Sequence, residues 1–365
     1  MDKFPYMEQY GYEQLVYFND TNTGLKAITC VHNTVLGPSL GGTRMWNYKT
    51  EEEAAYDVLR LARGMTYKSS LAGLSLGGGK TVIIGDADIL RRDPIKKEAF
   101  WRAFGRYVEG MNGRYITSAD MNTGNQELTY INMETNHVVG LPGRSGSPSP
   151  YTARGVFNSI KACAEYTWGS TNLTGKTVAV QGAGGAVGYS LCKLLHEAGA
   201  DLIVSDISAE KVEPCVTNFG ATAVEGDAIY SAQCDIFAPS AMGAVLNAQT
   251  IPVLKCKIVC GAANNVLADP TKDNQALADR GIVYAPDYLA NAGGVINVFH
   301  ELAVGGYNEA NSLRDIDTIY HRMLDLLQKA ETAGELTGVT ADRLAEERIE
   351  AVRGIKSIMT SNNRR

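Results

Sequence analysis

This sequence lacks the cysteine and histidine patterns that are typical of disulfide-bonded or metal-binding proteins. Its seven cysteines are scattered, and none forms a C-x-x-C pair; they stand at positions 30, 163, 192, 215, 234, 256 and 260. We therefore expect reduced thiols in a cytoplasmic protein rather than a disulfide framework or a zinc site. The five histidines show no metal-ligand spacing, so no metal is expected at the functional site.

Long apolar runs and concentrations of basic charge are also missing. No apolar stretch approaches the ~18 residues of a membrane-spanning helix, and residues 1–5 lack the features of a signal peptide. A net charge of −6 without a basic stripe argues against nucleic-acid binding. What remains is a chain of 365 residues, 45% hydrophobic and 20% charged, which is typical of a globular protein with two domains.

Glycine, by contrast, is plentiful, with 38 residues, and its densest run precedes a lysine. Gly77-Gly78-Gly79-Lys80 leads into the β-branched stretch 81–85, which predicts a flexible turn followed by a buried strand. Lys68 lies twelve positions earlier, at the end of a helical segment. Two ammonium groups in one pocket repel and burial penalises their charge, so we expect a lysine pKa low enough for proton transfer near neutral pH. A glycine turn beside a solvated lysine is the simpler alternative.

The same run is close to a nucleotide-binding P-loop but does not fit it. Gly79-Lys80-Thr81 matches the end of that motif, yet Leu74 stands where the motif requires glycine. A P-loop also leads from a strand into a helix, whereas this run leads into a strand. Phosphate binding by this segment is therefore not expected.

The N-terminal part of the chain carries both strand and helix signals. Residues 14–18 and 25–31 are strand-like and flank a turn-forming segment, which predicts a hairpin. The glycines and proline of 37–42 break this pattern. A helix is predicted after Thr50, which fits an N-terminal cap, and a second helix over 96–110.

Residues 141–150 form the clearest boundary in the chain. Their small turn formers and three prolines predict a linker rather than regular structure. Beyond it, helices alternate with short apolar strands, which predicts a parallel sheet with helices on both faces. The expected strands are 177–181, 202–206, 235–238, 257–260 and 282–285. The tail from about residue 310 reads as helical.

A glycine-rich turn after the first of these strands indicates dinucleotide binding. The turn is Gly182-Ala183-Gly184-Gly185-Ala186-Val187-Gly188, and a helix follows it. Bare backbone at a helix N-terminus can approach a pyrophosphate. Asp206, at the end of the next strand, is placed to accept hydrogen bonds from the adenosine ribose and to repel a 2′-phosphate, which favours NAD over NADP. The glycine spacing is one residue longer than the usual motif, and an ordinary tight turn is the alternative.

Further polar residues are candidates for the chemistry. Asp120 near Lys68 and Lys80 could pair with one lysine and share its proton, although a turn acid is the alternative for Asp120 alone. Asn264 and Asn291 follow strand ends, where open α/β sheets bind ligands. Their carboxamides could bind a substrate carboxylate or the nicotinamide amide, or could simply cap helices.

Together these motifs resemble the Glu/Leu/Phe/Val dehydrogenase family, with its leucine and phenylalanine members nearest. The resemblance covers roughly residues 10–350. It rests on Gly41-Gly42-Thr43-Arg44-Met45, Gly64-Met65-Thr66-Tyr67-Lys68, Leu74 with Gly77-Gly78-Gly79-Lys80, Gly113–Thr117 before Asp120, Gly261-Ala262-Ala263-Asn264-Asn265, and Ala285-Pro286-Asp287-Tyr288 with Asn291-Ala292-Gly293-Gly294.

The resemblance implies a role for each site residue. Lys68 would hold the substrate carboxylate, Lys80 would be the general acid/base, and Asp120 would share its proton. Around them Gly41, Gly42, Met65 and Asn264 would line the substrate cleft, while Thr152, Asn264 and Asn291 would approach the nicotinamide, and Ala238, Pro239 and Ser240 would run along the cofactor.

The side-chain pocket implied by the resemblance falls on Leu40, Ser118, Val295 and Val298. Three aliphatic residues and no cation argue against glutamate, whose second carboxylate would need a positive partner. Valine at positions 295 and 298 resembles the pattern of the leucine enzymes. Ser118, and Asn122 after Asp120, instead leave room for an aromatic substrate.

We therefore expect an α/β protein of two domains and a C-terminal helical segment. Residues 1–150 would form a substrate and oligomerisation domain with a mixed sheet, 151–330 a doubly wound Rossmann domain, and 331–365 a segment packing back on the first domain. The implied activity is NAD-dependent, reversible oxidative deamination of a branched-chain L-amino acid, with a homo-oligomer, octamer or dimer, as the assembly. An aromatic amino acid dehydrogenase and a non-catalytic NAD-binding protein are the alternatives.

Overall fold

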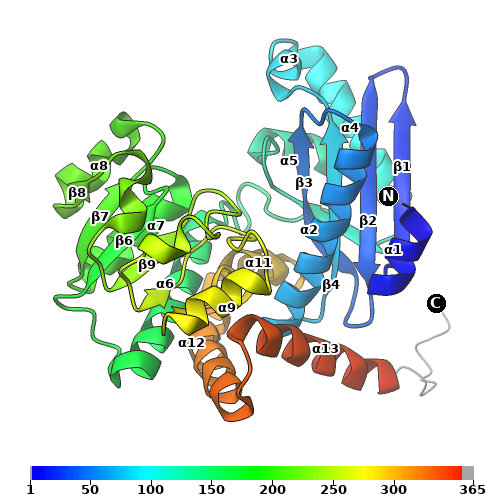
Figure 1. The fold of residues 1–365 in the computed structure, drawn as a ribbon. Helices are drawn as coiled ribbons and strands as arrows, with labels where there is room; N and C mark the ends of the chain where they lie inside the picture. The colour runs from blue at the N-terminus through cyan, green and yellow to red at the C-terminus, as the bar shows by residue number, and fades with distance from the viewer. Residues whose placement is uncertain (1, 356–365) are drawn as a thin grey trace. The chain divides into compact units, whose positions relative to one another are not determined.

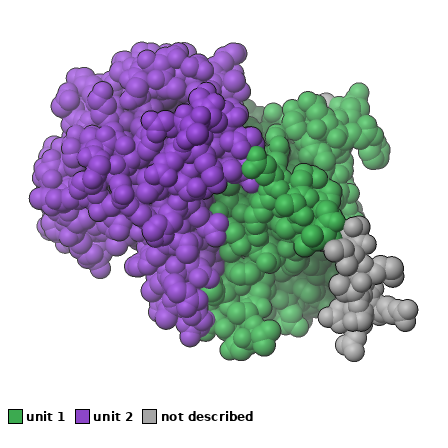
Figure 2. All heavy atoms as spheres, turned by 90° about the horizontal axis from the view of Figure 1, so that it is seen from below, with its two compact units in different colours: residues 1–147, 298–307, 345–365 green, residues 148–297, 308–344 purple. Residues whose placement is uncertain are grey.

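The computed structural model describes residues 2–355, which fall into two compact units (Figure 2). The first contains Met1–Ser147, Val298–Tyr307 and the described part of Ala345–Arg365; the second contains Pro148–Asn297 and Asn308–Leu344. The first crossing, between residues 147 and 148, lies close to the boundary expected at 150. The chain later returns to the first unit, at Val298–Tyr307 and again from Ala345. The second domain was expected to be continuous over 151–330 instead.

The first unit is built on a mixed sheet of five strands (Figure 1). Its order is β1-β2-β4-β3-β5, with β2 antiparallel to β1 and β4, and β3 parallel to β4 and β5. The expected hairpin is confirmed as β1 and β2. The strands are β1 (Gln14–Asp20), β2 (Leu25–Asn33), β3 (Ser39–Trp46), β4 (Gly77–Ile84) and β5 (Tyr115–Ser118).

Helices cover both faces of this sheet because strand residues alternate between the faces. Ile28, Cys30 and Val82 pack with α2 (Glu51–Leu71), while Ala27 and Ile83 pack with α4 (Pro94–Glu109). Thr50 caps α2 as expected, since its hydroxyl accepts a hydrogen bond from Glu53 N at 3.1 Å. The remaining helices before the boundary are α1 (Lys3–Tyr10), α3 (Ala87–Arg91) and α5 (Asn125–Asn132).

The prediction of a flexible turn at Gly77–Gly79 was wrong, because these glycines begin β4. Gly78 is needed for a close approach to the neighbouring helix rather than for a turn. A Cβ on Gly78 would lie 2.1 Å from the backbone nitrogen of Thr66 in α2. Strand and helix backbones therefore touch here, two residues before Lys80 in β4 and two residues before Lys68 in α2.

The pattern break predicted over 37–42 was also only partly right. Gly37 is the turn, with a φ of 155°, but β3 already begins at Ser39 and includes Gly41 and Gly42. Small residues are accommodated in this strand because it is enclosed by β4 and β5 on either side. Sequence propensity alone disfavours a strand with two glycines, and tertiary packing overrides it.

The second unit contains a parallel sheet in the order β11-β10-β9-β6-β7-β8. From β6 the chain adds strands to one side and then, starting with β9, to the other, so the order reverses between β6 and β9. This is the doubly wound arrangement expected from the sequence. The strands are β6 (Thr177–Gln181), β7 (Asp201–Ser205), β8 (Thr222–Ala223), β9 (Ile236–Pro239), β10 (Ile258–Val259) and β11 (Val283–Tyr284).

Helices of the second part of the chain largely match the predicted alternation. The exception is α6 (Ser149–Trp168), which begins inside the segment predicted to be a linker. Pro150 is tolerated there because the first turn of a helix needs no backbone donor. The other elements are α7 (Ala186–Glu197), α8 (Ala209–Phe219), η1 (Gly226–Ser231), η2 (Ile251–Val253), α9 (Lys272–Asp279), α10 (Asp287–Ala290), α11 (Gly293–Phe299) and η3 (His300–Leu302).

The tail is helical, as predicted, in α12 (Glu309–Ala333) and α13 (Thr337–Ile355). From Ala345 onward α13 belongs to the first unit and contacts α2 there. Tyr67 donates to Glu346 at 2.6 Å, and Arg348 donates to the carbonyls of Ser70 and Leu74, each at 2.9 Å. These bonds attach α13 to the C-terminal end of α2 and to the segment that follows it. No helix within residues 2–355 is long and apolar enough to cross a membrane.

We predict that Gly78→Ala lowers the free energy of unfolding by about 3 kcal/mol, because the new methyl group forces β4 away from α2. Urea denaturation followed by circular dichroism measures the change. A variant as stable as the wild type would contradict the close backbone contact.

Gly64→Ala is the matched control in the same helix. No atom lies within 4 Å of its added Cβ, and helical alanine is favoured over glycine by up to about 1 kcal/mol. This variant should therefore gain stability in the same titration.

Candidate active site

Lys80 and Asp120 form a close ion pair in the first unit. Lys80 lies on β4 and is 7% exposed, and its Nζ lies 2.6 Å from Asp120 Oδ2. Asp120 follows the end of β5 and lies over β3, where a Cβ on Gly42 would come within 2.9 Å of the Asp120 Cβ. Gly42 thus leaves the space that Asp120 occupies. The pairing of Asp120 with one lysine is the arrangement that the sequence analysis expects.

Arg44 is a second cation on the same carboxylate, with no role predicted from the sequence. Its Nε lies 3.2 Å from Asp120 Oδ2. Burial raises the pKa of Asp120, but Lys80 and Arg44 outweigh that effect and lower it to about 2. Asp120 is therefore a carboxylate throughout the physiological range. Alternation along β3 could have indicated this contact, since Arg44 and Gly42 share a face of that strand.

Lys68 and Met65 lie in the last two turns of α2 and are half-buried. The backbone contact between Thr66 and Gly78 brings this part of α2 against the start of β4. Lys68 follows Thr66 by two positions and Lys80 follows Gly78 by two positions, so both lysines lie close in sequence to the point where helix and strand touch.

Three of the four expected pocket residues belong to the first unit. Leu40 is 1% exposed on β3, and Ser118 is 8% exposed at the end of β5. A Cβ on Gly140 would lie 3.5 Å from Ser118 Oγ and 3.8 Å from Val298 Cγ1, so Ser118 and Val298 flank the same point. Val295 is buried in the second unit.

Glu301 is a further residue that the sequence analysis missed. Its Oε1 accepts hydrogen bonds from Gly140 N at 2.9 Å, from Ser145 N at 3.1 Å and from the Ser145 hydroxyl. The carboxylate therefore ties residues 140–145 to the segment that carries Val298. No local sequence signal predicts this contact, because its partners are more than 150 residues apart.

The glycine-rich turn of the second unit fits a pyrophosphate. It follows β6 at the point where the strand order reverses, and Gly185 caps the N-terminus of α7. A Cβ on Gly188 would lie 2.1 Å from the Gly182 carbonyl oxygen, so the turn needs glycine for its own packing. An open helix start with its backbone donors exposed is an anion site.

Asp206 fits a ribose but already has backbone partners. Its Oδ2 accepts from Gly184 N at 3.1 Å and its Oδ1 from Ile207 N at 2.8 Å. Each carboxylate oxygen has a second lone pair, so both can still accept a hydroxyl. These bonds also fix the carboxylate beside the turn, where it would repel a 2′-phosphate.

The remaining cofactor candidates gather beyond the ends of β9, β10 and β11. Asn291 donates to Asn264 Oδ1 at 2.9 Å and to the Ala262 carbonyl at 3.0 Å, and Ser240 Oγ accepts from Ala262 N at 3.4 Å. Asn291 Oδ1 is buried and has no hydrogen-bond partner among the described residues, so it can accept a further donor. Ala238 and Pro239 end β9, and a Cβ on Gly294 would lie 2.5 Å from Thr152 Oγ1.

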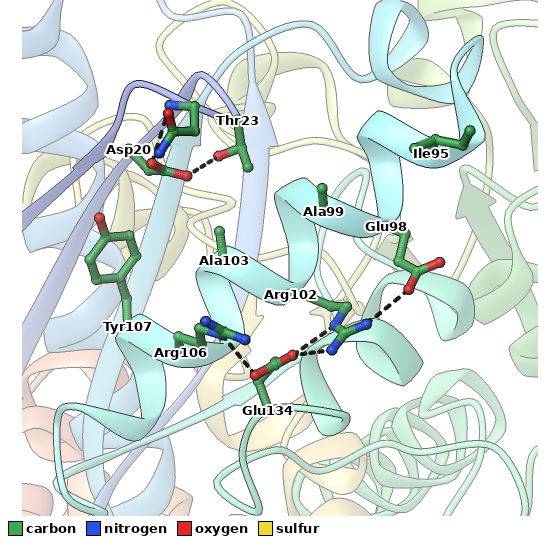
Figure 3. Close-up of a pocket in the computed structure, with 11 residues that line it drawn as sticks. Asp20, Thr23, Ile95, Glu98, Ala99, Arg102, Ala103, Arg106, Tyr107 and Glu134 are labelled. Atoms are coloured by element: carbon green, nitrogen blue, oxygen red, sulfur yellow. Dashed lines mark hydrogen bonds and ion pairs between the residues drawn. The ribbon is translucent and has the colours of Figure 1, made fainter.

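A separate groove of about 720 Å³ lies between α4 and the β1–β2 turn, away from the residues above (Figure 3). Its arginines are already neutralised: Arg102 and Arg106 both bind Glu134, at 2.6 and 2.8 Å, and Arg102 also binds Glu98. None of the predicted site residues lines it. This groove is therefore not assigned to the candidate active site.

Two family models match the chain. Residues 13–137 match the Glu/Leu/Phe/Val dehydrogenase dimerisation domain, and residues 204–328 match the Glutamate/Leucine/Phenylalanine/Valine dehydrogenase model. The chain belongs to this family. The resemblance inferred from the motifs is thereby confirmed, and the protein is an amino acid dehydrogenase.

Several members of the Glu/Leu/Phe/Val dehydrogenase family match almost the whole chain. Leucine dehydrogenase of Bacillus subtilis is 52% identical over 99% of this chain and 98% of its own length. L-tryptophan dehydrogenase of Nostoc punctiforme is 44% identical over 97% and 98%, and its crystal structure covers 96% of this chain and 99% of its own with a TM-score of 0.81. Phenylalanine dehydrogenase of Lysinibacillus sphaericus is 44% identical over 97% and 92%.

The lowered pKa of Asp120 predicts a pH-dependent contribution to stability. The folded protein binds this proton less readily than the unfolded chain, so the contribution is complete above about pH 4 and is lost as pH falls toward 2. It amounts to about 2 kcal/mol. Urea unfolding between pH 5 and pH 3 should show a steeper loss of stability for the wild type than for Asp120→Asn.

Asp201→Asn serves as the control, because Asp201 is an exposed carboxylate of the second unit. It should follow the wild type across the same pH range. Equal slopes for wild type and Asp120→Asn would show that Asp120 is not held ionised by its neighbours.

Proposed function

We propose that this protein catalyses the NAD-dependent, reversible oxidative deamination of a branched-chain aliphatic L-amino acid, leucine before valine and isoleucine. The products are the 2-oxo acid and ammonia. The observation that carries the proposal is the buried Lys80–Asp120 pair, in a chain 52% identical to a leucine dehydrogenase. An acid/base pair of this kind is what the proton transfers of deamination require.

In this mechanism each side chain has one task. Lys68 binds the substrate carboxylate, and Lys80 takes a proton from the substrate amine or from the water that adds to the iminium carbon. Asp120, fixed 2.6 Å from Lys80 Nζ, stabilises the ammonium that forms. Bound NAD supplies the acceptor for the hydride that leaves Cα. Water is consumed when it adds to the iminium carbon and forms the carbinolamine. Lys80 then returns a proton to the nitrogen, the C–N bond breaks and ammonia leaves, and the hydroxyl loses its proton to give the 2-oxo acid.

The pocket residues favour a branched aliphatic substrate. Leu40, Val295 and Val298 offer apolar surface, and no cation stands among the pocket residues to pair with the second carboxylate of glutamate. A hydrophobic pocket separates substrates that differ by one methylene by only ~1–3 kcal/mol, so valine and isoleucine should also react.

An aromatic amino acid is the second candidate. It is favoured by Ser118, which is small, and by relatives named tryptophan and phenylalanine dehydrogenases at 44% identity. A non-catalytic NAD-binding role is less well supported, since it gives no reason for a buried lysine paired with a carboxylate.

The decisive experiment is NADH production with leucine, valine, isoleucine, phenylalanine, tryptophan and glutamate under identical conditions. We expect the highest kcat/KM with leucine, and much lower rates when NADP replaces NAD. Preference for glutamate would overturn the pocket argument, and preference for an aromatic substrate would select the second candidate.

Lys80→Ala is the control for the chemistry in this experiment. It should reduce turnover by at least about 10²-fold, the usual scale for a general acid/base, while NADH still binds, because the glycine-rich turn belongs to the other unit. Unchanged kcat would remove Lys80 from the mechanism.

We further propose that the protein is a cytoplasmic homo-oligomer, octamer or dimer. The matching N-terminal family model is described as a dimerisation domain, and β1 is an edge strand whose backbone groups on one side are available for pairing. Multi-angle light scattering should give a mass that is a multiple of the 39.3 kDa chain. A monomer at micromolar concentration would contradict the proposal.

A further inference from the structure

Arg44 stands beside the acid/base pair on the neighbouring strand. In the parallel register of β3 and β4, Arg44 is opposite Val82, so its side chain shares the sheet face of Lys80 and Val82. Its Nε lies 3.2 Å from Asp120 Oδ2, the oxygen that Lys80 Nζ contacts at 2.6 Å. One carboxylate oxygen is thus held from two directions by two cations.

The other side of the Arg44 guanidinium is held as well. Its Nη1 lies 3.2 Å from Asp57 Oδ2 on α2, and the same oxygen accepts a hydrogen bond from the Tyr48 hydroxyl at 2.6 Å. Burial and the neighbouring Asp57 raise the pKa of Tyr48, so its hydroxyl stays a neutral donor. Burial disfavours the charged guanidinium, but Asp120 and Asp57 outweigh this and raise the pKa of Arg44.

Charges therefore alternate along a row of four side chains, Lys80, Asp120, Arg44 and Asp57. Between 9% and 29% of each side chain is exposed. Interactions in such partly buried positions are several times stronger than in bulk water. Removing the charge of any other member should consequently change how tightly Lys80 holds its proton. The direction of the change depends on the sign of the charge that is removed.

We propose that Arg44 is a positioning residue for the reaction: it fixes the ionised carboxylate of Asp120 against the Lys80 amine, and Asp57 with Tyr48 holds the guanidinium in place. The inference rests on the proposed acid/base role of Lys80. Without Arg44, Asp120 can rotate, and its charge is balanced by Lys80 alone.

The fork of the guanidinium matters as well as its charge. Nε contacts Asp120 while Nη1 contacts Asp57, so one planar group links a carboxylate beyond β5 with a carboxylate on α2. A lysine has a single ammonium on a flexible stem and cannot hold both partners in fixed geometry. Arg44→Lys therefore separates the contribution of charge from that of position.

The test compares Arg44→Met, Arg44→Lys and Asp57→Asn with the control Arg106→Met. Arg106 is 73% exposed in the groove of Figure 3 and pairs with Glu134, so its loss removes a surface ion pair of the same unit. The readouts are kcat, KM and the pH profile of kcat/KM for leucine, with the Kd for NADH and the thermal unfolding midpoint checking that each variant is folded.

Opposite shifts of the pH profile are the signature of the proposal. Arg44→Met removes a positive charge, so the remaining groups hold protons more tightly and the acid limb of kcat/KM moves up by about one pH unit. Asp57→Asn removes a negative charge, so the limb moves down by a smaller amount. A merely structural role would lower activity in both variants without shifts of opposite sign.

The expected loss in kcat for Arg44→Met is about 10²-fold, the scale associated with misplacing a catalytic group by about 1 Å. Arg44→Lys should lose less, about tenfold, and keep its acid limb near that of the wild type, because the charge remains while the fork is lost. Arg106→Met should match the wild type in every readout.

A second measurement needs no turnover and keeps the inference separate from the proposed activity. Cyanate, a small reagent, carbamoylates only unprotonated amines, and peptide mass spectrometry gives the rate at Lys80 at pH 8. We expect a several-fold slower rate in Arg44→Met and a faster rate in Asp57→Asn. If the wild type oxidises none of the amino acids tested, the proposed function fails, yet these rates still decide the role of Arg44.

Wild-type rates and pH profile in folded Arg44→Met would overturn the inference. Shifts of the same sign in Arg44→Met and Asp57→Asn would overturn it too. If Arg44→Met does not fold, Arg44→Lys and Asp57→Asn decide the question by the same criteria.

Discussion

The site in the first unit depends on one carboxylate oxygen, Asp120 Oδ2, which is shared by the cations of Lys80 and Arg44. A half-buried anion is stable only with such partners, and a largely buried lysine only with such an anion. Because Lys80, Arg44 and Asp120 come from β4, β3 and the segment after β5, the mixed order of the sheet is what lets them meet. The fold and the chemistry are joined at this contact.

Close backbone approach is the second requirement of this arrangement. Gly78 lets β4 touch α2 at Thr66, and Gly42 leaves room for Asp120 above β3. Larger residues at either position would separate the elements that carry the site's charged groups. The glycine content of the N-terminal motifs therefore serves packing around charged groups, and the local conformation there is ordinary extended strand.

Each unit carries a different part of the candidate site. The second unit supplies the glycine turn, Asp206 and the asparagines, whose arrangement suits a dinucleotide. The first unit contains the Lys80–Asp120 ion pair and, among the expected pocket residues, Leu40, Ser118 and Val298. Relatives named for leucine, tryptophan and phenylalanine all match nearly the whole chain.

Local sequence signals determined much of this protein: the hairpin of β1 and β2, the cap at Thr50, the alternating strands and helices after residue 150, and the turn before α7. The pairing of Asp120 with a lysine was also expected from sequence, and the structure shows it with Lys80. Tertiary structure alone decided that Gly77–Gly79 are strand, that Arg44 binds Asp120 and that Glu301 clamps Gly140 and Ser145. The physical reason is range: periodicity and turn chemistry act over a few residues, whereas these contacts join elements up to 161 positions apart, whose meeting is set by sheet order and helix packing.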